Sequence, residues 1–414
     1  MIINEKRYWD LLMQLAEITD PEKPYTRRSF TDLFLDGRKW LTERMHAAGL
    51  ETHIDTAGNL IGTLKGSANT GKCIAIGSHS DTVPSGGRFD GIAGVIAGLE
   101  CVLSWRDRGV TFEHDVQVID FLAEEPSEWG ISCVGSRGIT GFLNEELQNT
   151  LHPDTGEKLS DAVARMGGDT TKLVKRDDVV ANFEIHIEQG QVLESEKISV
   201  GVVTGIVGII RLEVVLKGQS NHAGTTPMHL RKDTLTTASH IISYAANLAT
   251  EMDSKTDDYL VATCGQVFVT PNASNVVPGQ TKLVFDIRSD NKDLMESFVA
   301  QLHEFAKQKS DTDNIDIISW KRLTDTTPVE SDEVLMAHLD SACESQNISH
   351  KRMPSGAGHD AAFMAHIAPM AMVFVPSLDG KSHCPEEWTE PDEMAKGVSV
   401  LAGAIEAFAS SNAY

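Results

Sequence analysis

Apolar residues recur along the first half of the chain with two spacings, one typical of helices and the other of strands. The segments predicted in this way are strands at 50–64, 73–78 and 115–122 and helices at 5–18, 30–49 and 92–105. Strands interleaved with helices favour an α/β fold, with a mixed, mostly parallel sheet and helices on both of its faces.

A different order of elements begins near Gly205–Gly208. It comprises strand 209–217, helix 233–250, strand 259–269, strand 276–289, helix 291–309 and strand 313–322. This β-α-β-β-α-β order is that of the ferredoxin-like arrangement. After about residue 324 the first pattern resumes, with helix 332–346, a Gly-rich turn at 355–360 and strand 370–376.

We therefore expect a discontinuous larger domain at 1–208 and 324–414, and a smaller domain inserted at 209–323. The polar segments 144–182 and 250–258 are expected to be solvated surface.

Charge and composition exclude several classes of partner. The chain has 414 residues, with 36 Lys and Arg against 60 Asp and Glu, a formal net charge of −24. Such an acidic chain without a basic block is a poor candidate for binding nucleic acid or an anionic membrane. It contains no run of eighteen apolar residues and no signal-peptide pattern, and its six cysteines are scattered without a Cys-x-x-Cys pair. We expect reduced thiols and a cytoplasmic location.

The first candidate for chemistry is His79-Ser80-Asp81, at the end of an apolar strand. The spacing puts both ionisable side chains on one face, where the carboxylate can orient the imidazole. With fifteen histidines in the chain such pairs also arise by chance, as His53-Ile54-Asp55 shows. Only the first pair opens a Gly/Ser-rich turn at the carboxyl end of a buried strand, where open α/β sheets place their sites. Asp90, further along the same turn, would ordinarily be a helix N-cap, but the glycines around it let the chain return towards His79.

Two adjacent carboxylates, Glu124 and Glu125, end the strand at 116–122. They repel each other unless a cation neutralises one or a proton stays on the other. Although such pairs are common in solvated loops, at a strand end one can be a metal ligand and the other a general base.

Two further segments carry histidines. Glu184, His186 and Glu188 alternate with apolar residues and so share one strand face. For Glu188, orientation of a ligand, contact with a substrate and a plain salt bridge all remain open. His383 precedes Cys384, but no cysteine-hydrolase signature surrounds this thiol, and we assign it no catalytic role.

Taken together, these imidazoles and carboxylates at different strand ends form a ligand set of the kind that zinc accepts, in which an Asp can bridge two ions. The set comprises His79, Asp90, Glu125, His186 and His383. We expect a pair of divalent metal ions, with Glu124 moving a proton.

At this point the chain resembles the dinuclear metal-dependent amidohydrolases of the hydantoinase/carbamoylase group, which lie inside the aminoacylase-like metallopeptidase clan. The group includes N-carbamoyl-L-amino acid hydrolase, β-ureidopropionase, allantoate amidohydrolase and ureidoglycolate hydrolase. The matching motifs, collinear over essentially the whole chain, are 78–83, 87–91, 123–125, 186–190, 218–228, 275–279, 286–288, 355–361 and 382–383.

The resemblance implies one metal ion held by His79, Asp90 and His186 and a second held by Asp90, Glu125 and His383. Asp90 would bridge the ions, Asp81 would support His79, and Glu124 would be the general base for a water that both ions share. His222 would add a donor to the oxyanion, from its own subunit or from a partner. The substrate contacts implied are Gln189, Asn275, Arg288, Gly356, Ala357, Gly358 and His359. An arginine at position 288 would ordinarily be interpreted as forming a surface ion pair with Asp286 or Asp290. The place of Arg288 in the family pattern favours a substrate contact instead.

The activity implied is hydrolysis of linear C–N bonds in a small anionic substrate, an N-carbamoyl amino acid or a related ureido acid. The alternatives are an aminoacylase or dipeptidase of the same clan and, from another class, a catalytically silent binding protein. Zinc is the preferred ion, with manganese, cobalt and nickel as alternatives. The resemblance also implies a homodimer through the inserted lid domain, which closes over the substrate.

One departure concerns the segment after the Glu pair. Much of the family reads Gly-Ser-Arg-Phe there, whereas this chain has Pro126-Ser127-Glu128-Trp129. We expect Glu128 and Trp129 to reshape the substrate side of the pocket. Beside His383, Cys384 is expected to be sensitive to oxidation.

Overall fold

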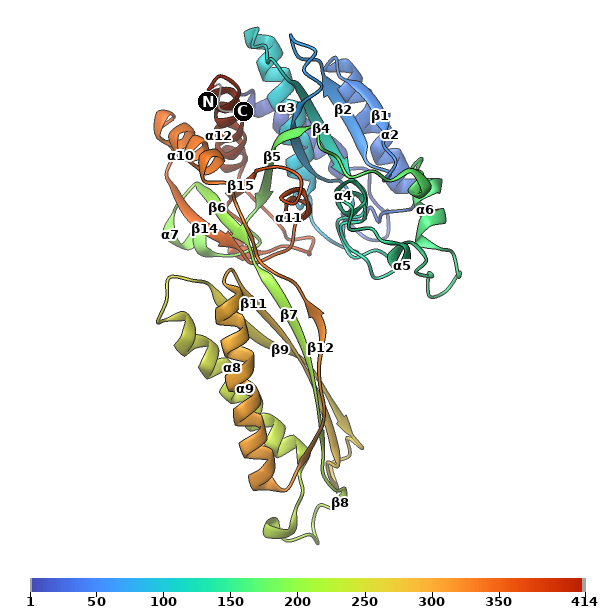
Figure 1. Cartoon of the computed structure of the whole chain (residues 1–414), viewed down its shortest axis with the longest axis vertical. Coiled ribbons are helices and arrows are strands. Elements are labelled where there is room, and N and C mark those ends of the chain that lie inside the picture. The colour runs from blue at the N-terminus through green and yellow to red at the C-terminus, as the bar shows by residue number, and fades with distance from the viewer. Residues whose placement is uncertain (1, 412–414) are drawn as a thin grey trace. The chain divides into compact units, whose positions relative to one another are not determined.

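Residues 2–411 are described by a computed structural model (Figure 1), in which the chain forms two compact units. The first contains the residues up to Thr204 and those from Ser331 onward, and the second is Gly205–Glu330.

The first unit is built on a mixed sheet with the strand order β1-β2-β4-β3-β5-β15-β6-β13, and β14 also pairs with β6. Its strands are β1 Glu51–Ile54, β2 Leu60–Leu64, β3 Cys73–His79, β4 Asp115–Phe121, β5 Val179–Ile187, β6 Val200–Ile206, β14 His350–Ser355 and β15 Met370–Val375. The short strand β13 Val329–Glu330 pairs with the end of β6 at Gly205 and Ile206, and these four residues belong to the second unit. The four central strands, β4, β3, β5 and β15, run parallel. Their carboxyl ends therefore meet at one edge of the sheet.

Helices cover both faces of this sheet. They are α1 Glu5–Ala16, α2 Asp32–Ala47, α3 Ile92–Arg108, α4 Val134–Thr140, α5 Glu145–Gln148, α6 Leu159–Arg165, α7 Val192–Glu196, α10 Glu333–Ser345, α11 Asp360–Met364 and α12 Pro391–Ala409. Alternate residues of the fully buried strand β3 enter different core clusters. Ile74 and Ile76 pack with α1, α3 and α12, whereas Ala75 packs with α4 and α11. This two-residue alternation is why a continuous apolar run predicts a strand buried on both faces.

The second unit has a four-stranded antiparallel sheet in the order β12-β7-β11-β9. Its elements are β7 Gly208–Lys217, β8 Asn221–His222, α8 Thr234–Asp253, β9 Leu260–Thr270, β10 Val276–Val277, β11 Gln280–Ser289, α9 Lys292–Asp313 and β12 Asp316–Asp325. Alternate residues of β7, from Ile210 to Leu216, pack under α8 and α9. The two sheets confirm the predicted fold class, which is an α/β fold with a ferredoxin-like insertion.

Some local expectations are wrong. Segment 144–182 is not simply solvated surface, because it contains α5 and α6, and α6 packs into a core cluster with Phe30 and Phe34. Its buried residues are Leu159, Ala162, Val163 and Met166, at helical spacing. The run at 50–64 is two strands, β1 and β2, and α12 was not foreseen. Among the described residues, no helix is long and apolar enough to cross a membrane.

Candidate metal centre and active site

Four chain segments bring ionisable side chains to the carboxyl edge of the parallel strands. His79 is the last residue of β3, and His186 lies near the end of β5. Glu124 and Glu125 follow β4, and His383 lies in the segment after β15. This edge is where open α/β sheets place their functional sites.

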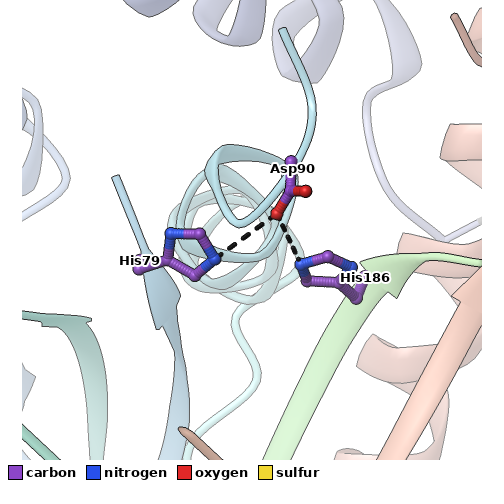
Figure 2. A group of neighbouring side chains, drawn as sticks. All are labelled: His79, Asp90 and His186. Atoms are coloured by element: carbon purple, nitrogen blue, oxygen red, sulfur yellow. Dashed lines mark ion pairs between the residues drawn. The ribbon is translucent and has the colours of Figure 1, made fainter. Parts of the chain in front are cut away.

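The first group consists of His79, Asp90 and His186, all buried (Figure 2). Asp90 Oδ1 lies 3.5 Å from His79 Nε2 and 3.1 Å from His186 Nε2. Asp90 reaches this position because the turn after it is tight. Gly91 has φ +67°, and a Cβ atom there would lie 2.3 Å from the His79 ring. Only glycine therefore fits between Asp90 and α3.

Contacts on the other side of each ring show how the two histidines are oriented. His79 Nδ1 lies 3.0 Å from the carbonyl oxygen of Asp81, and His186 Nδ1 lies 2.9 Å from that of Ile187. A carbonyl oxygen only accepts hydrogen bonds, so each Nδ1 carries a hydrogen, and in its neutral form each ring would present its Nε2 lone pair to Asp90. Two lone pairs and a carboxylate oxygen that face one another suit a cation between them.

The second group consists of Asp90, Glu125 and His383. His383 Nε2 lies 3.1 Å from Asp90 Oδ2 and 3.2 Å from Glu125 Oε1. The Asp90 carboxylate thus turns one oxygen to each group, as a bridging ligand would. The groups differ in exposure, because the His383 side chain is 49% exposed whereas that of His186 is 1% exposed.

The pKa values reflect this packing in the chain without metal ions. Although burial opposes it, the charge of His186 and its hydrogen bond hold the pKa of Asp90 well below its usual value. Hydrogen bonds to Asp90 and then Glu125 raise the pKa of His383 to about 10. The imidazoles thus act as the counterions that bound cations would replace.

Glu124 lies beside both groups. Its Oε2 is 3.6 Å from His79 Nε2, and its Oε1 accepts a weak hydrogen bond from the Cys133 thiol at 3.5 Å. Burial raises the pKa of Glu124 well above its usual value, and the neighbouring Glu125 adds to the shift while His79 opposes it. A carboxyl group with a raised pKa suits proton transfer.

Asp81 contacts His79 in two ways. Its carbonyl oxygen is the nearer partner of His79 Nδ1, and its Oδ1 lies 3.6 Å away. The same Oδ1 accepts the backbone N–H of Glu124 at 3.2 Å. Asp81 therefore connects the first group to the carboxylate predicted to be the base.

Two of the predicted substrate residues of the first unit, Gln189 and His359, contact the candidate ligand groups. Gln189 Nε2 donates to Asp90 Oδ2 at 2.7 Å. His359 follows the segment Gly356, Ala357 and Gly358 and lies with its ring 4.6 Å from that of His186. Burial, followed by repulsion from His186, holds the pKa of His359 well below its usual value.

The second unit holds the other three predicted residues, and it brings only two of them together. Val276 pairs with His222 in the β8–β10 ribbon, and the Ala223 N–H donates to the Asn275 carbonyl oxygen at 2.9 Å. Arg288 lies near the other end of β11, where its Nε is 2.6 Å from Asp286 Oδ1. Between Gln280 and Arg288 a strand spans about 26 Å at roughly 3.3 Å per residue. Within one chain, Asn275 and Arg288 therefore do not meet.

The structure also shows which partners Glu188, Trp129 and Glu128 contact. Glu188 accepts the backbone N–H groups of Val192 and Leu193 at 2.7 and 2.9 Å, so it supports the start of α7. Trp129 is 7% exposed in the core cluster of Phe30, and its indole N–H donates to the Glu157 carbonyl oxygen. Glu128 pairs with Arg28.

Two residues that contact Asp90 were given no role from the sequence, although Ser382 stands in the matching motif 382–383. The Ser382 hydroxyl lies 2.9 Å from Asp90 Oδ2, and the buried Glu387 accepts the N–H groups of Phe89 and Asp90. A signal was present, because Glu386-Glu387 repeats the Glu-Glu pattern that drew attention to Glu124 and Glu125.

A two-unit α/β fold with overlapping histidine and carboxylate groups at its sheet edge is typical of metal-dependent hydrolases. Known proteins agree with this class. The peptidase family M20/M25/M40 matches residues 75–407. N-carbamoyl-L-amino acid amidohydrolase of Geobacillus stearothermophilus is 35% identical over 405 residues, 97% of each chain. Allantoate amidohydrolase of Escherichia coli strain K12 is 37% identical over 387 residues, 92% of each chain.

A solved amidase of the hydantoinase/carbamoylase family from Burkholderia multivorans superposes with a TM-score of 0.92 at 32% identity, and 98% of both chains is covered. The chain therefore belongs to peptidase family M20/M25/M40 and, within it, to the hydantoinase/carbamoylase amidases. It is an amidohydrolase of linear amides.

Proposed function

We propose that the chain hydrolyses the ureido C–N bond of an N-carbamoyl amino acid or a related ureido acid such as allantoate or ureidoglycolate, at a centre of two divalent metal ions. The observation that carries the proposal is the Asp90 carboxylate, whose two oxygens face separate groups of candidate ligands. The relatives named above act on substrates of this chemical class, as their names state.

The donor atoms fit divalent ions. His79, Asp90 and His186 would hold one, and Asp90, Glu125 and His383 the other, with zinc as the preferred ion and manganese, cobalt or nickel as alternatives. When bound, such ions polarise the scissile carbonyl and lower the pKa of a water molecule.

Glu124 is the proton carrier in this proposal. Its carboxylate takes the proton of the attacking water and delivers it to the departing nitrogen. Asp81 holds His79 and Glu124 in place, because it contacts the His79 ring and the backbone N–H of Glu124. The carbamate released from a ureido acid then decomposes to carbon dioxide and ammonia.

Residues of the second unit would bind the rest of the substrate. His222 Nδ1 accepts the N–H groups of Gly224 and Thr225 at 3.1 and 3.2 Å. Its hydrogen is therefore on Nε2, which is the form needed to donate to a developing oxyanion. Arg288 suits a substrate carboxylate because its planar guanidinium makes two-pronged contacts. Since His222 and Asn275 lie far from Arg288 within one chain, we propose a homodimer in which the ribbon serves the partner's site.

A substrate panel tests the reaction. Metal-reconstituted enzyme is assayed with N-carbamoyl-β-alanine, N-carbamoyl-α-amino acids, allantoate and ureidoglycolate by ammonia release. N-acetyl amino acids and dipeptides are followed by free amine. Metal-dependent turnover of one ureido acid well above the rest is expected. Turnover of only acyl or peptide substrates would instead establish an aminoacylase or peptidase.

Mixed dimers test the assembly. Glu124→Gln and His222→Ala subunits are inactive separately in this proposal. If the ribbon acts in the partner's site, random subunit exchange restores about a quarter of the wild-type activity. No recovery in a verified mixed dimer would place His222 in its own subunit's site.

A further inference from the structure

Glu387 connects two of the three chain segments that carry the residues of the second group, those of Asp90 and His383. It lies between β15 and α12 and is fully buried. Its Oε1 accepts the backbone N–H groups of Phe89 at 2.8 Å and Asp90 at 3.2 Å. Its Oε2 is 3.0 Å from the Ser382 hydroxyl, which is itself 2.9 Å from Asp90 Oδ2. One carboxylate thus contacts the main chain of the bridging residue and, through Ser382, its side chain.

The surroundings of Glu387 indicate that this contact is its role. Among the described residues no Lys, Arg or His forms an ion pair with Glu387. Its polar contacts are the N–H groups of Phe89 and Asp90 and the Ser382 hydroxyl, whose single hydrogen also faces Asp90 Oδ2. The segment around Gly87 packs directly against this carboxylate. A Cβ atom at Gly87 would lie 2.0 Å from Glu387 Oε1, so the glycine provides the space that the carboxylate fills.

We propose that Glu387 is a positioning residue that sets the occupancy of the second group more than that of the first. The inference rests on the proposed function, since it requires both groups to hold metal ions. The Glu387–Ser382 pair reaches Asp90 Oδ2, the oxygen that faces His383. Asp90 Oδ1 instead faces His79 and His186, which backbone carbonyls orient independently.

The experiment titrates metal-free protein with Mn²⁺ in a calorimeter and uses three variants. Glu387→Ala removes both acceptor oxygens, whereas Glu387→Gln keeps the length and one carbonyl oxygen for the two N–H groups. Glu386→Ala is the matched control, because this adjacent glutamate is exposed and makes no hydrogen bond or ion pair among the described residues.

We expect wild type to bind two ions. Glu387→Ala weakens one of them about 10- to 100-fold, the effect typical of a residue that supports a ligand, and leaves the other nearly unchanged. Glu387→Gln restores most of the lost affinity, and Glu386→Ala binds as wild type. Equal weakening of both ions, two wild-type affinities in Glu387→Ala, or no rescue by Gln would overturn the inference.

Folding and the proposed function are tested separately. If Glu387→Ala fails to fold, Ser382→Ala replaces it, because this variant removes the contact with Asp90 Oδ2 and keeps the two backbone bonds. Ser382→Ala should show the same selective weakening, and unchanged binding of both ions would refute the role. If wild type itself binds no pair of ions, the proposed metal centre is wrong. If wild type binds two ions but the variants do not weaken one ion more than the other, only the proposed role of Glu387 is wrong.

Discussion

The two halves of the candidate metal centre share Asp90 but are built differently. In the first half every ligand is buried, and backbone carbonyls fix both imidazoles. In the second half His383 is 49% exposed, lies in a loop with φ +56°, and faces two carboxylates. The first half is therefore preorganised by strands, whereas the second depends on a loop and its supporting contacts. An ion in the second half should therefore exchange more easily.

The largest effect should come from the residue that belongs to both halves. Asp90→Asn places an amide N–H₂ where one ligand oxygen was and removes the charge, so neither ion should bind at concentrations that saturate wild type. Turnover should then fall by more than the roughly 10²–10⁴-fold typical of losing a proton-transfer group alone. Elemental analysis after desalting, with circular dichroism to check folding, measures this. Two retained ions would show that Asp90 is no bridge.

Next in size is Glu124→Gln, which belongs to neither half. The amide cannot take a proton from water, so kcat should decrease about 10²–10⁴-fold. Both ions should remain bound, because Glu124 belongs to neither candidate metal group. Steady-state kinetics and metal analysis on one preparation test the pair of expectations. Hydrolysis at the wild-type rate would remove Glu124 from the mechanism.

Metal removal compares the two halves directly. A chelator should strip the loaded enzyme in two phases, the faster one from the half that contains the exposed His383. His383→Ala should abolish the fast phase and His186→Ala the slow one, each with an affinity loss of at least about 100-fold at its own ion. Stopped-flow absorbance of the chelate follows both phases. A single phase shared by both variants would show that the halves act as one unit.

A smaller effect concerns pH. The pKa of His383 is raised to about 10, so at neutral pH this imidazole is protonated in the metal-free chain. An ion in the second half must displace that proton, and its apparent affinity should rise by about tenfold per pH unit up to about pH 10. Proton release on metal addition at pH 8, read with an indicator dye, should fall by about one per chain in His383→Ala.

The same shift affects stability with a defined sign. Because the folded pKa exceeds the unfolded value of about 6.5, the contribution of His383 is fully present below that pH. It fades as pH rises through about 10. Unfolding of the metal-free protein at several pH values, with His383→Ala as control, measures this change.

The sequence predicted the fold class and the ligand types because both leave periodic or local signals. Strand β3 is a continuous apolar run that ends in His79, and the glycine at 91 marks the turn that returns Asp90. The separation of Asn275 from Arg288 already followed from the predicted strand at 276–289, because an extended strand places residues at its two ends far apart. The surroundings of Trp129 could not be predicted, because a large aromatic residue shortly after the Glu124-Glu125 pair suits a pocket wall and a core equally well.

The smallest expected effect concerns Glu188, whose role the alternation of residues in β5 did not decide. Glu184, His186 and Glu188 share one strand face, yet only His186 faces Asp90. Glu188 instead accepts two N–H groups at the start of α7. Glu188→Ala should therefore lower the free energy of unfolding by about 1–2 kcal/mol, as loss of a helix cap does, while kcat and metal content stay at wild-type values. Denaturant unfolding and kinetics on the same preparation separate the two. A loss of turnover without a loss of stability would indicate that Glu188 contacts the substrate. This strand face would then contribute a substrate contact in addition to the candidate ligand His186.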